Sequence, residues 1–481
     1  MTSPTRPTPD RPQSAIRRII APLASLKLTV LLIALSIILV FTGTLAQRHQ
    51  GIWDVLHTYF RAPIVFIPLD IFLSERSERS FAVPFPGGYT IGLLMLLNLI
   101  AAHALRFRVK ARGRRLLTGA TLVAVGVLSI FWFHSGPLPA RILSDAGGYA
   151  GVLPLMLVGA LFYAPLVAGC ALTFARRAGI VLIHASLMLL LAGEGVTAAT
   201  ALETQMPIYV GATSNWSQDI REVELVLIDP SSPESDLTIA ISQSALQRAA
   251  SSGELIANPA MPVAILVDRY FPNSDIRPLS PGEQPSATAG FGVNVAAVGL
   301  PRVTGVDRNR SINVPAAIVT LLREGLPIGT YLVSPHLQLA SFIPAEQEVR
   351  IADRPYRLAM RFRRFHKPYS MRLDAFHHDL YPATNIPKNF SSDIHISDPA
   401  RSIDHEVKIK MNNPLRFEGE TFFQSGYIPA NHPGEPDLGT VLSVVKNPGW
   451  TIPYIACAAG LIGLVYQFGA SLIRFLRRST P

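Results

Sequence analysis

The stretch 176–211 constrains this chain more than any other part of its sequence. It opens with a basic pair, Arg176 and Arg177, continues as an apolar run to Ala192, and then enters a long polar region. About 20 predominantly apolar residues are enough to cross the hydrocarbon core of a bilayer. We therefore expect a transmembrane helix over residues 178–200 that leads directly into a water-exposed domain.

The composition predicts several membrane helices together with one sizeable polar domain. Hydrophobic residues make up 49% of the 481 residues, and the mean hydropathy is +0.31. These values are too apolar for an ordinary soluble protein and too polar for a wholly embedded one. The formal charge of +10 does not indicate nucleic-acid binding, because the densest basic runs lie at the ends of apolar segments, where they set membrane topology.

The apolar runs predict about six transmembrane helices. The expected helices cover residues 26–47, 89–105, 116–134, 149–174, 178–200 and 450–470. The first run is long and its exit lacks a clear cleavage site, so we expect an uncleaved anchor rather than a signal peptide.

The segments between these helices differ in charge. Residues 1–25 are expected to form a disordered cytoplasmic N-terminus, and residues 48–88 an extracytoplasmic loop. A basic cytoplasmic loop (106–115) and a basic cytoplasmic tail (471–481) complete the prediction. Six crossings place every basic cluster on one side, as the positive-inside rule requires. We therefore expect a multi-pass protein of the cell inner (cytoplasmic) membrane.

Residues 203–449 contain no apolar run long enough to span a bilayer. Short alternating or β-branched stretches recur there, at 221–229, 316–322 and 440–447, and Pro, Gly, Asn and Asp interrupt them. This pattern is typical of strands. The expected fold is therefore a membrane protein of about six transmembrane α-helices, with a large extracytoplasmic β-rich domain inserted before the last helix.

Both cysteines, Cys170 and Cys457, lie inside apolar runs. The sequence has neither a CxxC pair nor a CxxCH motif, so we expect neither a thiol redox site nor a covalently attached c-type haem.

Motifs near the C-terminus follow one another in a specific order. They are NNPLRFEG (412–419), FFQSGY (422–427) and a Pro-Gly pair, Pro448 and Gly449, before the last apolar run. This order resembles the closing signature of ResB, also called CcsB, the membrane subunit of System II cytochrome c maturation. Residues 23–47 and 386–396 are similar to further segments of that family.

The resemblance implies a non-catalytic or co-catalytic subunit of a haem lyase (cytochrome c synthase) that relays haem outward to apocytochrome c. The implied cofactor is haem b, held non-covalently and transiently. The implied partners are a CcsA-type haem-handling membrane protein, apocytochrome c and thiol-reducing proteins, besides the lipid bilayer. The tryptophan-rich motif of CcsA is missing here, since Trp53, Trp132, Trp216 and Trp450 are scattered.

This sequence departs from the family in one respect. ResB is usually described with four crossings, and residues 116–174 supply two more, for which we have no assigned role. The alternative function is a membrane-anchored β-domain that acts as a sensor or assembly scaffold without haem. A transporter is disfavoured because the sequence shows no internal repeat or pair of broken helices.

Two histidines lie within apolar runs near their basic ends. His184 belongs to the helix 178–200, which is similar to a ResB helix carrying a haem-associated histidine, and His103 lies near the end of the helix 89–105. An ionisable ring at such a depth has to face protein, a cavity or a ligand, and neutral imidazole is a standard ligand of haem iron.

We therefore take His184 and His103 as candidate haem ligands, with His184 as the candidate ligand of the haem iron. The alternative to a haem-ligand role is a structural one. Each histidine would then hydrogen-bond to a neighbouring helix, or, for His103, to headgroup water. The two rings either share one haem or each pair with a histidine of CcsA, and the resemblance favours the second arrangement. Arg106, Arg176 and Arg177 are candidates for pairing with the haem propionates, as arginine does with carboxylates.

Histidines also gather in the expected outer domain between residues 366 and 405. His377 and His378 are candidates for binding haem there. The alternative is that they are solvated histidines at a strand edge.

Overall fold

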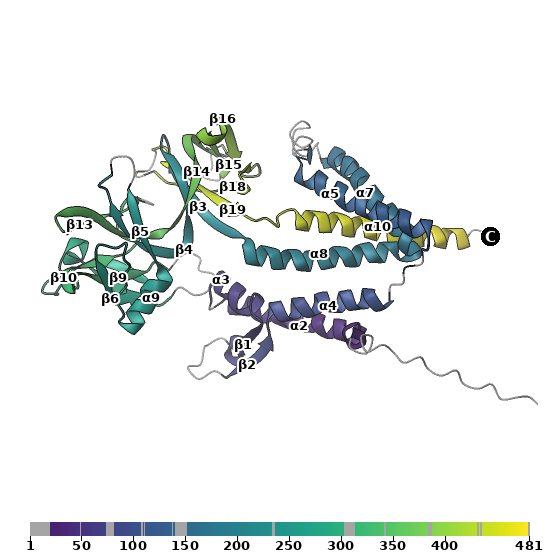
Figure 1. Cartoon of the computed structure of the whole chain (residues 1–481), viewed down its shortest axis with the longest axis horizontal. Coiled ribbons are helices and arrows are strands. Elements are labelled where there is room, and N and C mark those ends of the chain that lie inside the picture. Colours follow the sequence, from purple (N-terminus) through teal and green to yellow (C-terminus); the bar gives the residue numbers. More distant parts are fainter. Residues whose placement is uncertain are drawn as a thin grey trace, which may run out of the picture. The chain divides into compact units, whose positions relative to one another are not determined.

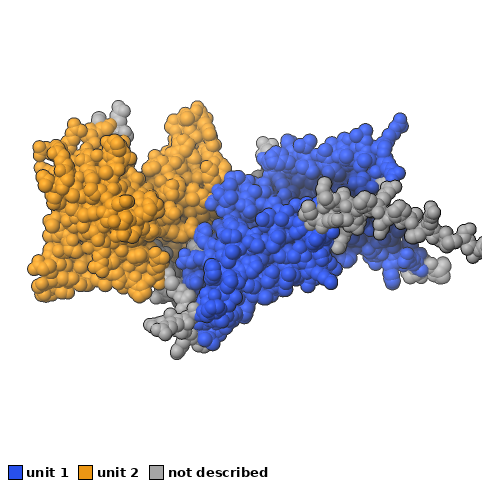
Figure 2. Space-filling model, turned by 60° about the horizontal axis from the view of Figure 1, so that its bottom comes forward, with its two compact units in different colours: residues 1–201, 447–481 blue, residues 202–446 orange. Residues whose placement is uncertain are grey.

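The computed structural model divides into two compact units (Figure 2). Unit 1 comprises Met1–Ala201 and Asn447–Pro481, and unit 2 comprises Leu202–Lys446. The structure describes residues 20–48, 50–73, 81–106, 109, 111–136, 138–139, 152–232, 236–302, 313–340, 343–382, 387–430, 432 and 435–479. Most of the expected N-terminal segment, part of the basic loop 106–115 and the start of the expected helix 149–174 therefore lie outside the described residues.

Unit 1 is built from long apolar helices (Figure 1). They are α2 (Leu26–Ala46), α4 (Gly88–Arg106), α5 (Arg114–Ser135), α7 (Val152–Phe174), α8 (Ala178–Thr200) and α10 (Ile452–Ser479). By length and composition the described residues contain 5 candidate membrane spans. These helices indicate a membrane protein.

The number of crossings depends on how the segment from α7 to α8 is counted. The two helices are joined by a 3₁₀ turn at Ala175–Arg177, and together they give one candidate span of 47 residues, Pro154–Thr200. A straight helix of that length would be about 70 Å long, whereas the hydrocarbon core is about 30 Å thick. Ala175 has a φ of 51°, which breaks the α-helix at this point. The expected total of six crossings stays a prediction.

Small residues allow the helices of unit 1 to approach closely. A Cβ atom built on Gly179 of α8 would lie 2.8 Å from the carbonyl oxygen of Gly463 in α10, and one on Gly126 of α5 would lie 2.4 Å from the backbone nitrogen of Leu166 in α7. In a bilayer, such close packing drives association, because lipid tails are as apolar as the side chains. Both helix pairs are antiparallel, as Figure 1 shows for α8 and α10.

The segment between α2 and α4, expected as a loop, is ordered where it is described. It contains α3 (Ile52–Val55), a π-helix (Leu56–Phe60), β1 (Ile64–Pro68), a 3₁₀ turn (Leu69–Phe72) and β2 (Ala82–Pro86). Val55, Tyr59 and Val65 are buried against Leu32 and Leu39 of α2. The apolar residues of this segment therefore form a small core with the helix that precedes it.

Unit 2 confirms the expected β-rich domain. Its strands are β3 (Leu202–Tyr209), β4 (Thr213–Asp229), β5 (Leu237–Ser242), β6 (Ala264–Phe271), β7 (Ser274–Pro278), β8 (Val295–Gly299), β9 (Ala316–Arg323), β10 (Leu326–Val333), β11 (Gln338–Ala340), β12 (Ile343–Pro344), β13 (Gln347–Ile351), β14 (Arg354–Leu380), β15 (Pro387–Asp398), β16 (Ile403–Lys410), β17 (Leu415–Phe417), β18 (Glu420–Ile428) and β19 (Gly439–Lys446). Among its described residues, one α-helix, α9 (Gln243–Ser252), accompanies them.

The main sheet of unit 2 is antiparallel and has 10 strands, with the path β16-β15-β14-β4-β3-β19-β18-β17 and with β13 and β5 paired outside it. β14 is 27 residues long and joins two cores. Its first half packs in a core with β4, β6, β9 and α9, and its second half packs with β3, β15, β18 and β19. Between the two halves its register against β4 shifts twice, between Phe362 and Arg364 and between His366 and Met371.

We predict that Gly179→Ala destabilises unit 1 and that Gly195→Ala does not. The added methyl group at position 179 meets the backbone of α10, whereas nothing lies within 4 Å of a Cβ at Gly195 in the same helix. Overpacking of this kind typically costs about 1–3 kcal/mol, and an exposed Gly→Ala change in a helix is neutral or favourable. Thermal unfolding in mild detergent measures both variants, and equal midpoints would contradict the close α8–α10 contact.

Candidate functional site

The structure brings His103 and His184 together within unit 1. His103 lies near the end of α4 and His184 near the start of α8. The centroids of the two rings are 4.9 Å apart and the ring planes meet at 83°, an edge-to-face arrangement. Both side chains are half-buried. The two intramembrane histidines singled out from the sequence therefore form one contact.

Asn98 sets the rotation of α4 that presents His103 to α8. Its side-chain amide donates hydrogen bonds to the carbonyl oxygens of Leu23 (2.6 Å) and Ser25 (3.1 Å). Its amide oxygen accepts one from the hydroxyl of Thr29 (2.7 Å). Asn98 is only 2% exposed. Five residues along a helix correspond to about 140° around its axis, so α4 contacts α2 on one face and carries His103 on another.

A backbone contact defines the tautomer of His103. Its Nδ1 lies 2.9 Å from the carbonyl oxygen of Leu99. A carbonyl oxygen can only accept, so Nδ1 carries the proton and the lone pair lies on Nε2. A second hydrogen bond of this kind typically orients a metal-ligating imidazole. Nε2 is therefore the atom with which His103 would bind iron.

The packing of α8 against α10 orients His184 in the same way. Leu182 is 3% exposed and Ser186 is 5% exposed, and both contact glycines of α10. A shift of two residues corresponds to about 200° around the helix. His184 therefore projects away from α10, on the face where α4 lies.

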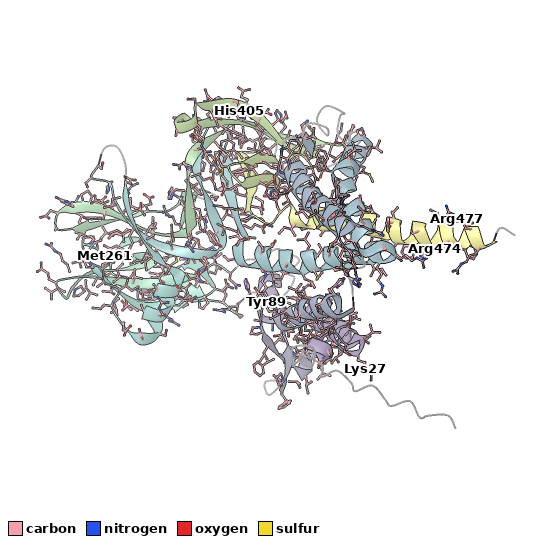
Figure 3. All side chains as sticks on the ribbon, turned by 45° about the vertical axis from the view of Figure 1, so that its right-hand side comes forward. Lys27, Tyr89, Met261, His405, Arg474 and Arg477 are labelled. Carbon is pink, nitrogen blue, oxygen red and sulfur yellow. The ribbon has the colours of Figure 1, made fainter. Side chains whose placement is uncertain are left out.

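Basic side chains gather at the end of unit 1 that holds the histidines. Arg176 and Arg177 immediately precede α8 and are exposed, and the Nε of Arg115 at the start of α5 donates to the carbonyl oxygen of Leu172 (3.1 Å). Because α8 and α10 are antiparallel, the last turns of α10, with the basic residues labelled in Figure 3, extend beyond the same end. The side chain of Arg106, the third candidate for propionate pairing, lies outside the described part of the chain.

In unit 2, His377 and His378 point to opposite faces of β14, as successive strand residues do. The Nε2 of His377 lies 2.7 Å from the carboxylate of Asp393, which is also 3.1 Å from the Nζ of Lys408. The Nδ1 of His378 lies 2.9 Å from the carboxylate of Asp437. The two histidines therefore do not face one ligand, and a carboxylate orients each imidazole.

The ring of His378 belongs to an aromatic cluster that the sequence analysis missed. Its centroid lies 4.5 Å from that of Phe390 and 5.1 Å from that of Tyr427, and Phe376 stacks on both of these rings. Phe376 and His378 are two residues apart and so share a face of β14. That spacing was visible in the sequence, but the contributions of β15 and β18 were not.

Another group of described side chains has ligand atoms within 4.8 Å of one another: Asp374, His395 and Glu406. The Nε of Arg372 donates to the carboxylate of Asp374 at 2.7 Å and so already supplies a positive charge there. Both acidic side chains of the group are exposed. We therefore assign no metal to it.

Comparison with known proteins gives two findings. The sequence model of the ResB-like family matches residues 173–441, which is more than half of the chain and includes α8 with His184. Protein NrfI of Wolinella succinogenes is 31% identical over 108 residues, a match that covers 22% of this chain and 11% of NrfI. The chain thus spans only a small part of the length of this curated relative. The family match confirms the resemblance seen in the motifs, and His103 lies outside it.

We predict that Asp393→Asn makes the stability of unit 2 less dependent on acidic pH. Burial acts to raise the pKa of Asp393, but hydrogen bonds from His377 and Lys408 outweigh it and lower the pKa. A carboxyl group with a lowered folded-state pKa adds stability above its unfolded pKa of about 3.9, and this is lost as pH falls through the folded value. The variant cannot ionise and lacks this loss.

The measurement is the thermal unfolding midpoint of the full chain in detergent between pH 6 and pH 3. The wild-type midpoint should fall more steeply than that of Asp393→Asn, and His377→Leu, which removes one donor, should be intermediate. Parallel curves for the three proteins would show that the His377–Asp393–Lys408 contact does not contribute.

Proposed function

This chain belongs to the ResB-like family, and from that premise we propose that it is the membrane subunit of a System II cytochrome c synthase that binds haem and relays it to the outer face. Membership of the family implies a role in cytochrome c biogenesis. Beyond this role, we propose that the chain binds haem, that it works with specific partners, and that it has a defined orientation in the membrane. The observation that carries it is the contact between His103 and His184.

The residues of this contact fit haem b. Haem iron is bound by the unprotonated nitrogen of an imidazole, and the Leu99 carbonyl holds His103 in the tautomer in which this nitrogen is Nε2. Nε2 of His103 is buried in the structure, so haem binding requires a change in the packing around this ring. Haem supplies the iron and the vinyl groups on which thioether bonds form. The chain's own residues bind and orient it, and the exposed side chains of Arg176 and Arg177 pair with propionates at the basic end.

The packing of the two rings favours a ligand from outside this chain. With their centroids 4.9 Å apart, His103 and His184 leave no room for a porphyrin between them unless α4 moves away from α8. A neutral imidazole has one unprotonated nitrogen with which to bind iron, so in this arrangement the two rings do not share one haem. We therefore propose that the second axial ligand is a histidine of a CcsA-type partner. Apocytochrome c and the thiol-reducing proteins that keep its cysteines reduced complete the proposed set of partners.

The proposed topology has six crossings, with α7 and α8 crossing separately. The antiparallel contacts of unit 1 put the start of α5, the turn at Ala175–Arg177 and the last turns of α10 at one end. Basic residues mark the cytoplasmic side of a membrane protein. In this topology unit 2 lies on the extracytoplasmic side, where apocytochrome c is matured, and haem made in the cytoplasm enters beside the histidines.

We predict that His184→Ala and His103→Ala each lower the Soret absorbance of the complex purified with its CcsA-type partner, and that the double variant loses most of it. Either loss should be partly restored by added imidazole, because the vacated position can accept a free ligand. His134→Ala is the matched control, since His134 is also on a membrane helix but its Nε2 lies 3.1 Å from the hydroxyl of Tyr163. A colourless wild-type complex, or an unchanged band in both variants, would favour the haem-free scaffold.

The proposed topology predicts which single cysteines a membrane-impermeant reagent labels, when each is introduced into a variant without the native cysteines (Cys170→Ser, Cys457→Ser). Ser135→Cys and Glu254→Cys should react with a membrane-impermeant maleimide in intact cells, and Arg177→Cys should react only after permeabilisation. The three positions bracket α7 and α8, so the same experiment tests whether these helices cross separately. Equal labelling of Ser135→Cys and Arg177→Cys from outside would contradict six crossings.

A further inference from the structure

A pocket in unit 2 contains a cation that is not paired with a carboxylate. Its volume is about 140 Å³, and its lining includes Tyr209, Thr213, Ser214, Trp216 and Arg364. It lies where β14 departs from regular pairing with β4: Arg364 is opposite Gln218, His366 is opposite Trp216, and the next pair is Met371 with Ser214. The extra residues of β14 and the end of β3 leave this space between the two cores.

The guanidinium of Arg364 lies face-on against an indole. Its Cζ atom is 3.9 Å from the centroid of the Trp216 ring. A cation–π contact of this kind uses the flat face of the guanidinium and leaves its in-plane N–H groups available as hydrogen-bond donors. The Nε of Arg364 is buried and has no hydrogen-bond partner among the described residues.

The carboxylates near Arg364 are engaged elsewhere. Glu224 accepts a hydrogen bond from the Nε of Arg361 at 2.9 Å, and Glu346 accepts one from Arg357 at 2.7 Å. Glu224 contacts only the backbone N–H of Arg364, at 3.4 Å. Throughout the described part of the chain, no carboxylate oxygen lies within 4.0 Å of the Arg364 guanidinium.

An arginine in this position keeps its charge. Burial, and then the neighbouring Arg361, lower the pKa of Arg364 to about 10, which still leaves the guanidinium protonated at neutral pH. Arg364 is half-buried, and a charged group that has lost part of its contact with water is stabilised by an opposite charge. The guanidinium therefore offers a positive charge and in-plane N–H donors to an anion that enters the pocket.

We propose that this pocket binds a carboxylate group, with the Arg364 guanidinium as its receptor and the rings of Trp216 and Tyr209 as apolar walls. The guanidinium fork matches the two oxygens of a carboxylate. A single cation in a small pocket suits a monoanion better than a doubly charged phosphate. This inference does not depend on haem binding by unit 1.

The test uses the full chain in detergent, titrated with sodium propionate while tryptophan fluorescence is recorded. Binding against the guanidinium that stacks on Trp216 should give a saturable change, which Trp216→Phe abolishes. Arg364→Gln should weaken propionate binding at least tenfold, or about 1.4 kcal/mol. Arg363→Gln is the matched control, because the side chain of Arg363 is 51% exposed and pairs with Glu222.

Unfolding measurements separate loss of the site from loss of the fold. Propionate should raise the unfolding midpoint of the wild type, as any ligand of the native state does, and should not raise that of Arg364→Gln. Without ligand, Arg364→Gln should be as stable as the wild type, because the change removes an unpaired charge. Arg364→Lys keeps the charge but not the fork and should bind propionate with intermediate affinity.

Two further probes identify the source of the carboxylate. N-acetylglutamate amide represents an acidic side chain of a protein, and tighter binding of this probe than of propionate would assign the site to a peptide. Equal or weaker binding would assign it to a free organic acid. Absence of a saturable change with both probes, the same affinity in Arg364→Gln, or equal competition by chloride or phosphate at matched ionic strength would overturn the proposal.

Discussion

The membrane unit depends on how one buried amide is satisfied. In hydrocarbon, a polar side chain has to find its partners within the protein, and Asn98 finds them at the start of α2. These hydrogen bonds hold one face of α4 against the start of α2. The resulting rotation of α4 turns His103 toward α8, so satisfying Asn98 also positions the imidazole.

α8 completes the arrangement by using two faces for two purposes. One face, with Gly179, Leu182 and Ser186, packs against α10. The other face carries His184, which contacts His103 of α4. The helix ends at Thr200 and β3 begins at Leu202, so the chain passes from the membrane unit into the β-rich unit almost without a linker. The helix that carries His184 is thereby joined directly to the first strand of unit 2.

In the described part of unit 2, several buried or half-buried basic side chains pair with carboxylates. Arg361 pairs with Glu224, and Lys367 pairs with Glu420, which also accepts a hydrogen bond from Tyr369. Such pairs offset the desolvation of both partners. Arg364 departs from this pattern, since only an aromatic ring meets its charged group. That departure occurs where the long strand β14 changes register, which is where a pocket can form.

The sequence predicted the parts of the molecule that local composition controls. Apolar runs identified the helices, alternation identified strands such as β4, β9 and β19, and short motifs identified the family. It also located His103 and His184 at the basic ends of their helices, because depth in the bilayer follows from counting residues along one helix. The ordered segment between α2 and α4 was missed, since its core comes from α2 rather than from its own pattern.

The sequence by itself therefore determined which segments form long apolar helices, which form strands, and near which helix ends His103 and His184 lie. Only the tertiary structure decided that His103 contacts His184, that His377 and His378 are held by Asp393 and Asp437 on opposite faces, and that Arg364 lies over Trp216. Each of these contacts joins residues on different elements. It follows from helix rotation and strand register, which the whole packed structure sets and no single stretch of sequence encodes.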